Sequence, residues 1–203
     1  MIILTKEKIK AVALKLFANN GYEGTSLENI AKEVGIRKAS IYSHFESKEE
    51  LFLTVLTDIL NLDIETLRKL SKKFKDYSTE KKLHSVFKYY CRVYNALSKK
   101  HEVVFIKRNM LFCPEVLREK VQYKIEAYEN SLNKILISIF EEGFKDNTIR
   151  PLDIKDLLAI FYCIIDGLFV EGRYYARKKY ASRFDSIWTM FWLSVANVKE
   201  QKQ

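Results

Sequence analysis

A short segment near the N-terminus combines hydrogen-bond donors with an absence of acidic residues. It runs from Arg37 to Phe45 and reads R-K-A-S-I-Y-S-H-F. At 100° per residue, a helix that turns Ile41 inward also buries Phe45 and turns the small and polar residues outward. A solvated surface helix is the alternative, but such a helix usually carries acidic residues. Short side chains that permit close approach, and donors that reach phosphates and base edges, favour a helix that enters the DNA major groove.

Enzyme chemistry finds less support in the sequence. The chain has no glycine-rich phosphate loop, and His44, His84 and His101 have neither metal-ligand spacing nor a neighbouring nucleophile. Three scattered cysteines exclude a disulfide framework and a cysteine-based zinc module, and they fit a reducing compartment. We therefore expect no enzyme activity, no metal and no cofactor. A DNA-binding-deficient adaptor with the same fold is a third class, and the intact surface from Lys38 to Lys48 argues against it.

The elements around this segment have the order of a helix-turn-helix. Apolar residues recur at helical spacing from Thr5 to Asn20, and Gly21 is a suitable helix stop. The sequence T-S-L-E at 25–28 predicts a capping box with Thr25 as the cap of a second helix, which ends at Gly35. A third helix is expected over about 37–45. A second capping box at 47–50 predicts the start of a fourth helix, which continues towards residue 70.

Residues 5–56 resemble the N-terminal domain of the TetR family of bacterial transcriptional regulators. The resemblance is carried by G-Y-E-G-T-S-L-E-N-I-A-K-E-V-G-I-R-K-A-S-I-Y-S-H-F-E-S-K-E-E-L, which matches in fixed register. It covers about a quarter of the chain by motif, and the rest agrees in length and helical character. The resemblance implies an all-α fold of about nine helices, in which residues 1–50 form the helix-turn-helix domain and residues 51–203 form an effector-binding and dimerisation domain.

The resemblance also implies roles at matching positions. Thr25, Tyr42, His44 and Lys48 correspond to contacts with the DNA backbone, and Lys38 and Ala39 open the recognition helix. Arg37 reaches either a guanine edge or a phosphate, of which the phosphate is favoured. Ser43 departs from the larger aromatic or basic residue of many relatives, which leaves the base preference open. The full set of expected DNA-binding residues is Thr25, Arg37, Lys38, Ala39, Ser40, Tyr42, Ser43, His44 and Lys48.

Composition agrees with this assignment without proving it. The chain has 203 residues but only 6 glycines and 2 prolines, which favours long helices with few turns. The net charge is +9, yet residues 51–100 carry most of the excess, with 11 Lys or Arg against 5 Asp or Glu. Bulk charge therefore does not locate the DNA surface. No secretion signal and no apolar run of membrane-spanning length is present, so a cytoplasmic protein without membrane partners is expected.

The C-terminal half is predicted to contain several long helices. The expected segments are about 79–98, 102–112, 115–144, 153–179 and 182–198, the last of them capped by Ser182. The last two are apolar on nearly all sides, and a helix of this kind must be buried on several sides. Pairing the two helices with those of a second copy in a four-helix bundle would bury them, so we expect a homodimer. Leu168 and Phe191 are the expected central interface positions.

Aromatic residues crowd the same half of the chain. Helix-spaced aromatics are more often core than ligand cage, but the family resemblance implies an effector pocket between these helices, with apolar walls and a few polar groups. The expected pocket residues are Phe87, Tyr90, Cys91, Tyr94, Phe105, Phe140, Tyr162 and Asp166. Three roles are open for Asp166: an ion pair with Arg173, an ion pair with a basic residue of the partner subunit, or attraction of a cationic effector. A structural ion pair is favoured.

The sequence thus predicts a ligand-responsive transcriptional regulator, most simply a repressor. We expect a homodimer, joined through the last two helices, that binds a palindromic double-stranded DNA operator and is released by an unidentified small-molecule effector.

Overall fold

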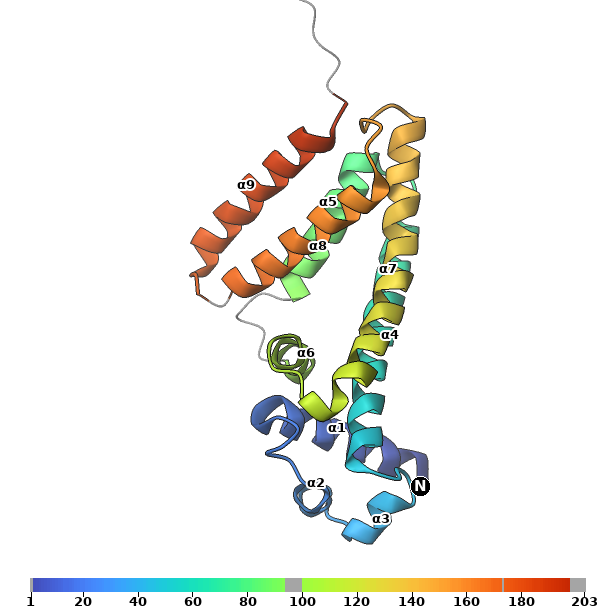
Figure 1. Cartoon of the computed structure of the whole chain (residues 1–203), viewed down its shortest axis with the longest axis vertical. Helices are drawn as coiled ribbons and strands as arrows, with labels where there is room; N and C mark the ends of the chain where they lie inside the picture. Colours follow the sequence, from blue (N-terminus) through green and yellow to red (C-terminus); the bar gives the residue numbers. More distant parts are fainter. Residues whose placement is uncertain (1, 94–99, 173, 198–203) are drawn as a thin grey trace, which may run out of the picture. The chain divides into compact units, whose positions relative to one another are not determined.

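The computed structural model describes residues 2–93, 100–172 and 174–197, and the described residues form an all-α fold (Figure 1). The expected fold class is therefore confirmed. The helices are α1 (Ile2–Asn20), α2 (Leu27–Val34), α3 (Lys38–Tyr42), α4 (Lys48–Lys73), α5 (Thr79–Val93), α6 (His101–Leu111), a 3-10 turn η1 (Glu115–Leu117), α7 (Arg118–Lys145), α8 (Ile154–Glu171) and α9 (Arg177–Val195).

The chain divides into two compact units that are not contiguous in sequence. Unit 1 contains residues 1–63 and 99–128, and unit 2 contains residues 64–98 and 129–203. The division falls inside α4 and inside α7, so each of these helices belongs to both units. Unit 1 thus includes α6 in addition to the first three helices. The functional boundary expected at residue 50 stays a prediction.

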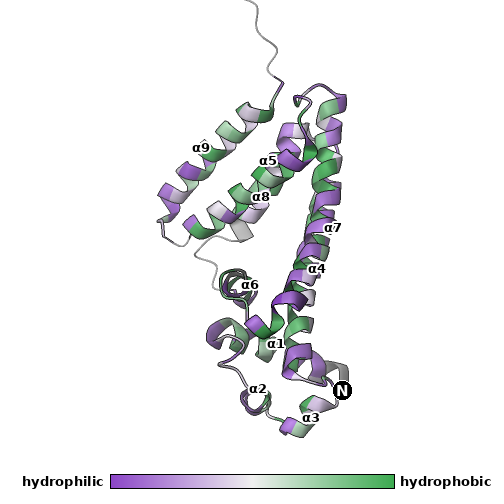
Figure 2. Ribbon diagram, viewed as in Figure 1, coloured by the Kyte–Doolittle hydropathy of each residue, from purple (hydrophilic) through white to green (hydrophobic). Residues whose placement is uncertain are grey.

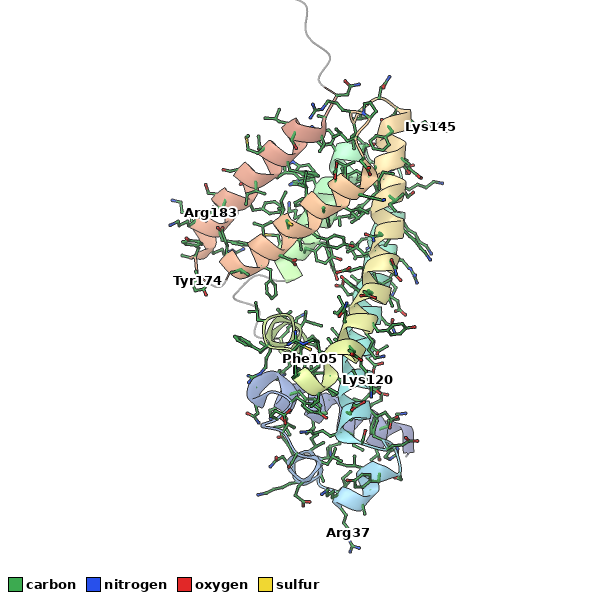
Figure 3. The ribbon with its side chains drawn as sticks, in the orientation of Figure 1. Arg37, Phe105, Lys120, Lys145, Tyr174 and Arg183 are labelled. Carbon is green, nitrogen blue, oxygen red and sulfur yellow. The ribbon has the colours of Figure 1, made fainter. Side chains whose placement is uncertain are left out.

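Unit 1 is built around an aromatic core. Phe17 of α1, Phe52 of α4 and Phe105 of α6 are each at most 1% exposed. The Phe52 ring centroid lies 5.1 Å from those of both Phe17 and Phe105. Each such ring buries a large apolar surface, and edge-to-face or tilted contacts add to the stabilisation. The helix α6, although distant in sequence, is therefore part of the core that supports α1 (Figure 3 labels Phe105).

Polar contacts reinforce the packing of unit 1. The Lys10 ammonium of α1 lies 2.6 Å from a carboxylate oxygen of Asp58 on α4. Arg108 of α6 donates a hydrogen bond of 3.2 Å to the carbonyl oxygen of Asn19, at the end of α1. Exposed or partly exposed pairs of this kind contribute little stability individually. Their main consequence is to fix the side of α1 on which α4 and α6 lie.

Unit 2 has its own core, in which Phe87 of α5 is central. The Phe87 ring lies 4.7 Å from Phe161 of α8, and 5.3 Å and 5.1 Å from Trp188 and Phe191 of α9, between ring centroids. Phe87 and Phe161 are fully buried. The apolar faces of α8 and α9 that point towards α5 thus form core within a single chain.

The boundaries of the last helices differ from the sequence prediction. The helix α8 ends at Glu171 instead of continuing to residue 179, and α9 begins at Arg177 instead of after Ser182. Ser182 lies inside α9, where its carbonyl accepts a hydrogen bond from Ser186. The break comes at Gly172, the C-cap residue of α8, and Gly has a low helix propensity. The predicted start of α8 is correct, because the Asp153 carboxylate accepts from the Lys155 amide at 2.8 Å.

The predicted interface positions on α8 and α9 are wrong. Leu168 is 2% exposed and Phe191 is 3% exposed within the single chain, because both point into unit 2. The opposite face carries the exposed apolar residues. They are Ile160 and Val170 on α8, at 45% and 42% exposure, and Met190 and Leu193 on α9, at 66% and 55%. Figure 2 shows hydrophobic residues along both helices. We call these four residues the α8–α9 apolar face.

Candidate nucleic-acid interface

The turn between α2 and α3 depends on Gly35. This residue has φ 82° and ψ 35°, a left-handed conformation that glycine adopts without the steric cost of a Cβ. Its amide donates to the carbonyl of Ala31 at 2.9 Å, and the amide of Ile36 donates to the same oxygen at 3.0 Å. These bonds end α2 and redirect the chain, as the sequence predicted. Arg37 follows in an extended conformation, and α3 begins at Lys38.

The inward side of α3 is as expected from its periodicity. Ile41 is fully buried and Phe45 is 1% exposed, and both belong to the core of unit 1. The helix itself is shorter than predicted, since it ends at Tyr42 and Ser43 is its C-cap residue. Phe45 nevertheless remains on the inward side, because its amide still donates to the carbonyl of Ile41 at 2.9 Å.

The outward side of α3 is exposed and lacks acidic residues. Arg37, Lys38, Ala39, Tyr42 and Ser43 are exposed, whereas Ser40 and His44 are partly buried. The Arg37 side chain extends away from the ribbon (Figure 3). The structure therefore brings seven of the nine expected DNA-binding residues to one surface. That surface offers cations, hydroxyls and an imidazole to a polyanion, and the small Ala39 at its centre permits close approach.

The hydroxyl of Ser43 is already engaged within the helix. Its Oγ donates to the carbonyl of Ser40 at 2.8 Å, so its free capacity is that of an acceptor. In this conformation Ser43 suits a donor on a base edge, such as the amino group of adenine or cytosine.

Thr25 does not cap α2, contrary to the sequence prediction. Its side chain is 1% exposed, and its hydroxyl donates to the carbonyl of Gly21 at 2.8 Å. The cap is Ser26, whose Oγ accepts from the Asn29 amide at 3.1 Å, while the Asn29 side chain accepts from the Ser26 amide at 3.0 Å. The capping box is therefore shifted by one residue, with Ser26 and Asn29 in the roles expected of Thr25 and Glu28. The phosphate contact proposed for Thr25 stays a prediction.

Lys48 is held against the turn that precedes α2. Its ammonium donates to the carbonyl of Tyr22 at 2.9 Å and lies 4.0 Å from the centroid of the Tyr22 ring. Lys48 therefore connects the first turn of α4 with the approach to α2, in addition to the phosphate contact expected from the sequence. The second predicted capping box forms in part: the Ser47 hydroxyl accepts from the Glu50 amide at 3.0 Å, but the Glu50 carboxylate accepts from the amide of Glu46 at 2.5 Å.

The expected effector-pocket residues do not all lie together. Phe87, Tyr90 and Phe140 are buried in unit 2. Phe105 instead belongs to the aromatic core of unit 1, which its sequence spacing could not reveal. Tyr94 lies outside the described residues.

Two polar groups of the expected pocket have identifiable environments. The Tyr162 hydroxyl donates to the side-chain oxygen of Asn133 at 2.8 Å, and burial raises the pKa of this hydroxyl above its ordinary value. Asp166 is exposed on α8, although partial desolvation raises the pKa of its carboxyl. Arg173, its proposed partner, lies outside the described residues.

The part of the chain that the structure describes contains neither a candidate metal site nor a candidate membrane-spanning helix. No group of three or more His, Cys, Asp or Glu side chains is placed to hold a metal ion among residues 2–93, 100–172 and 174–197. None of the described helices is long and apolar enough to span a bilayer.

Comparisons with known proteins agree with the geometry. Residues 9–55 match the family model described as bacterial regulatory proteins, tetR family. A curated relative is the negative transcriptional regulator IcaR of the icaADBC biofilm operon in Staphylococcus epidermidis, which is 28% identical over 90% of this chain and 88% of its own length. IcaR from Staphylococcus aureus is 26% identical over the same shares.

Solved structures show the same fold. FadR from Bacillus subtilis, solved in complex with stearoyl-CoA, has a TM-score of 0.72 and 20% identity, and the match covers 91% of this chain and 96% of that one. A TetR-family regulator from Agrobacterium tumefaciens also has a TM-score of 0.72, with 97% and 100% coverage and 20% identity. The helix-turn-helix geometry and the comparisons agree: residues 9–55 match the N-terminal domain of tetR-family bacterial regulatory proteins, and the chain is similar to transcriptional regulators over nearly its whole length.

Proposed function

We propose that the protein is a homodimeric repressor that binds a palindromic operator and is released by a small-molecule effector. The observation that carries the proposal is the exposed, acid-free surface of α3, supported on the buried residues Ile41 and Phe45. The similarity to IcaR, a negative regulator, supports repression over activation.

The α8–α9 apolar face supports the homodimer. An isolated exposed apolar residue needs no explanation, but four on two adjacent helices are typical of an interaction surface. Small residues lie beside them on α8, where Ala159, Cys163 and Gly167 are exposed at intervals of one helical turn. A Cβ on Gly167 would meet no atom within 4 Å in the single chain. Small residues of this kind let a second pair of helices approach closely, as a four-helix bundle requires.

The effector is proposed to bind in unit 2. The buried Phe87 and Phe140 and the partly buried Tyr162 would provide its apolar walls, and the Tyr162–Asn133 pair would provide a polar group of the kind that orients a ligand. Stearoyl-CoA bound to the structurally similar FadR supports a small-molecule effector as a class, without identifying it here. An effector releases DNA if it binds better to a conformation with a different spacing of the two recognition helices.

Selection from a random duplex library tests the operator proposal. We expect enrichment of an inverted repeat whose half-sites lie about 34–36 Å apart, or a multiple of this distance, because two symmetry-related α3 helices enter the major groove. Affinity measured by fluorescence anisotropy should fall steeply with salt concentration as phosphate counterions are released. Failure to enrich any sequence over the starting library would contradict specific operator binding, and a stable monomer in light scattering would contradict the dimer.

A further inference from the structure

A groove in unit 2 has a charge pattern that the regulator function does not explain. It has a volume of about 440 Å³ and is formed by the end of α4, the following loop, α5 and α7. This volume lies within the range of small-molecule sites. Four lysines line it, and the one acidic residue among the described lining residues is Glu142.

The acidic residue is already neutralised. Glu142 forms an ion pair with Lys82, whose side chain is only 13% exposed. Lys72, Lys75 and Lys134 remain, and none of these three has an ion-pair partner among the described residues. The groove therefore has a net positive potential that attracts anions.

The convergence of these lysines is not explained by helix-end electrostatics. A lysine in the last turn of a helix is favoured by the helix dipole, which accounts for Lys72 at the end of α4. Lys75 follows the end of α4 closely and can be favoured by the same dipole, but Lys134 lies well inside α7, so the dipole does not account for Lys134. Two segments that are distant in sequence, residues 72–75 and the middle of α7, bring these lysines to one hollow.

The groove also has an apolar wall. Val86 of α5 and Ile139 of α7 are buried, at 3% and 7% exposure, and Ile135 and Phe74 are partly buried beside them. An inorganic anion would leave this wall in contact with water. A ligand that carries both an anionic group and an apolar group would cover it.

The number of lysines without an ion-pair partner indicates the charge of the anion. Every cation among the described lining residues is a lysine. Lysine is a compact point charge that attracts either a phosphate or a carboxylate, so the amount of charge to be neutralised distinguishes between these anions. Phosphate carries more negative charge than a carboxylate, which matches the three lysines that lack a partner.

We propose that the groove lined by Lys72, Lys75 and Lys134 binds an organic phosphate that carries an apolar group. The phosphate contacts the three lysines, and the apolar group lies along Val86, Ile135 and Ile139. This site is distinct from the aromatic residues proposed for the effector, and its occupancy is measured without DNA. Its failure and the failure of the operator proposal are therefore distinguishable.

Isothermal titration of the full chain with n-decyl phosphate, below its micelle concentration, tests the proposal. Inorganic phosphate and decyl glucoside serve as the probes that lack the apolar chain and the charge, respectively. We expect decyl phosphate to bind about tenfold more tightly than either probe, because only this probe satisfies both the lysines and the wall. Equal affinity for inorganic phosphate, or for the glucoside, would overturn the proposal.

Variants locate the binding site. Lys75→Ala/Lys134→Ala should weaken decyl phosphate binding about tenfold or more, and Ser138→Asp should weaken it by placing a negative charge in the groove. All three residues are exposed, so the fold should persist in circular dichroism. The matched controls are Ser138→Ala and Lys155→Ala/Lys178→Ala, which removes two exposed lysines elsewhere in unit 2.

The controls should retain wild-type affinity. Undiminished binding in the groove variants would place the ligand elsewhere, and equal losses in the lysine control would reveal a nonspecific charge effect; either result overturns the proposal. Sedimentation with phosphatidylglycerol vesicles separates a soluble ligand from a membrane. Groove-dependent binding to vesicles without binding of monomeric decyl phosphate would also overturn it.

Discussion

The Lys48 ammonium donates to the carbonyl oxygen of Tyr22 and lies over the Tyr22 ring, so one cation joins the start of α4 to the segment that leads into α2. The contact spans 26 residues of sequence. If the same ammonium also contacts a DNA phosphate, its position is already set by Tyr22 before DNA binds.

Replacing Lys48 should affect stability as well as DNA binding. Lys48→Met removes the hydrogen bond and the cation–π contact while it keeps the aliphatic stem, and we expect a loss of about 1 kcal/mol in the free energy of unfolding. Operator affinity should fall by a similar factor for all sequences. Chemical denaturation and anisotropy measure the two effects. Lys38→Met is the control, because exposed Lys38 should affect affinity without affecting stability; an unchanged denaturation midpoint in Lys48→Met would argue against the contact.

Substitutions on the outward face of α3 should separate base preference from backbone binding. Ser43→Arg should change the preferred bases, because the side chain lies at the C-terminal end of α3 and is exposed. Tyr42→Phe should instead weaken binding to all sites by similar factors, since it removes one phosphate donor. Sequencing of selected duplexes gives the preference. An altered preference in Tyr42→Phe together with an unaltered one in Ser43→Arg would reverse these assignments.

The α8–α9 apolar face should be separable from the core beneath it. Met190→Lys and Gly167→Lys place a charge on the exposed face, so we expect monomers with wild-type helicity and strongly reduced operator affinity. Leu168→Lys should instead unfold unit 2, because this position is buried in the single chain. Light scattering measures whether the variants are monomers, and circular dichroism measures whether they remain folded. A folded dimer of Met190→Lys would show that this face is not the interface.

Adding a single methyl group at Gly35 should destabilise the protein through its backbone conformation alone, because Gly35 is left-handed. A Cβ at this position meets no atom within 4 Å, so a clash is not the cause. Gly35→Ala should cost about 1–2 kcal/mol, the usual difference for a left-handed conformation, and Gly35→Asn should cost less because asparagine tolerates it. Denaturant titration of both variants gives the comparison. Equal stabilities would show that the turn relaxes to another geometry.

His84 should make stability dependent on pH. Burial against Phe184 and Trp188, together with the nearby Lys88, lowers the pKa of the imidazole, while Asp185 and Glu80 oppose the shift. The unfolded chain then binds the proton more readily, so stability should fall as the pH drops through the ordinary histidine value of about 6.5 and below. The loss in the free energy of unfolding between pH 7.5 and 5 should be smaller in His84→Gln. An equal loss in both proteins would assign the pH dependence to other groups.

The helix-turn-helix can be predicted from the sequence because helical spacing and the turn glycine indicate the same elements. The burial of Ile41 and Phe45 follows from helical spacing, and Gly35 follows from the need for a left-handed residue. The sequence was less informative where two faces of a helix are both apolar. On α8, Leu168 and Ile160 have similar hydrophobicity, and only packing against α5 and α9 decides which one is buried. Helical spacing places Phe105 in the expected effector pocket, because spacing cannot reveal its contact with Phe52 on a helix distant in sequence.

That contact of Phe105 also limits how the protein can be re-engineered. Regulators are often recombined by joining the DNA-binding segment of one chain to the sensing segment of another. Here a fragment that stops at residue 50 would lack both Phe52 and Phe105, two of the three rings that form the aromatic core of unit 1. The helix-turn-helix of this protein is therefore not a portable module. A chimera that keeps its operator preference must also inherit the first part of α4 and the α6 segment, or supply rings of matching shape in their place.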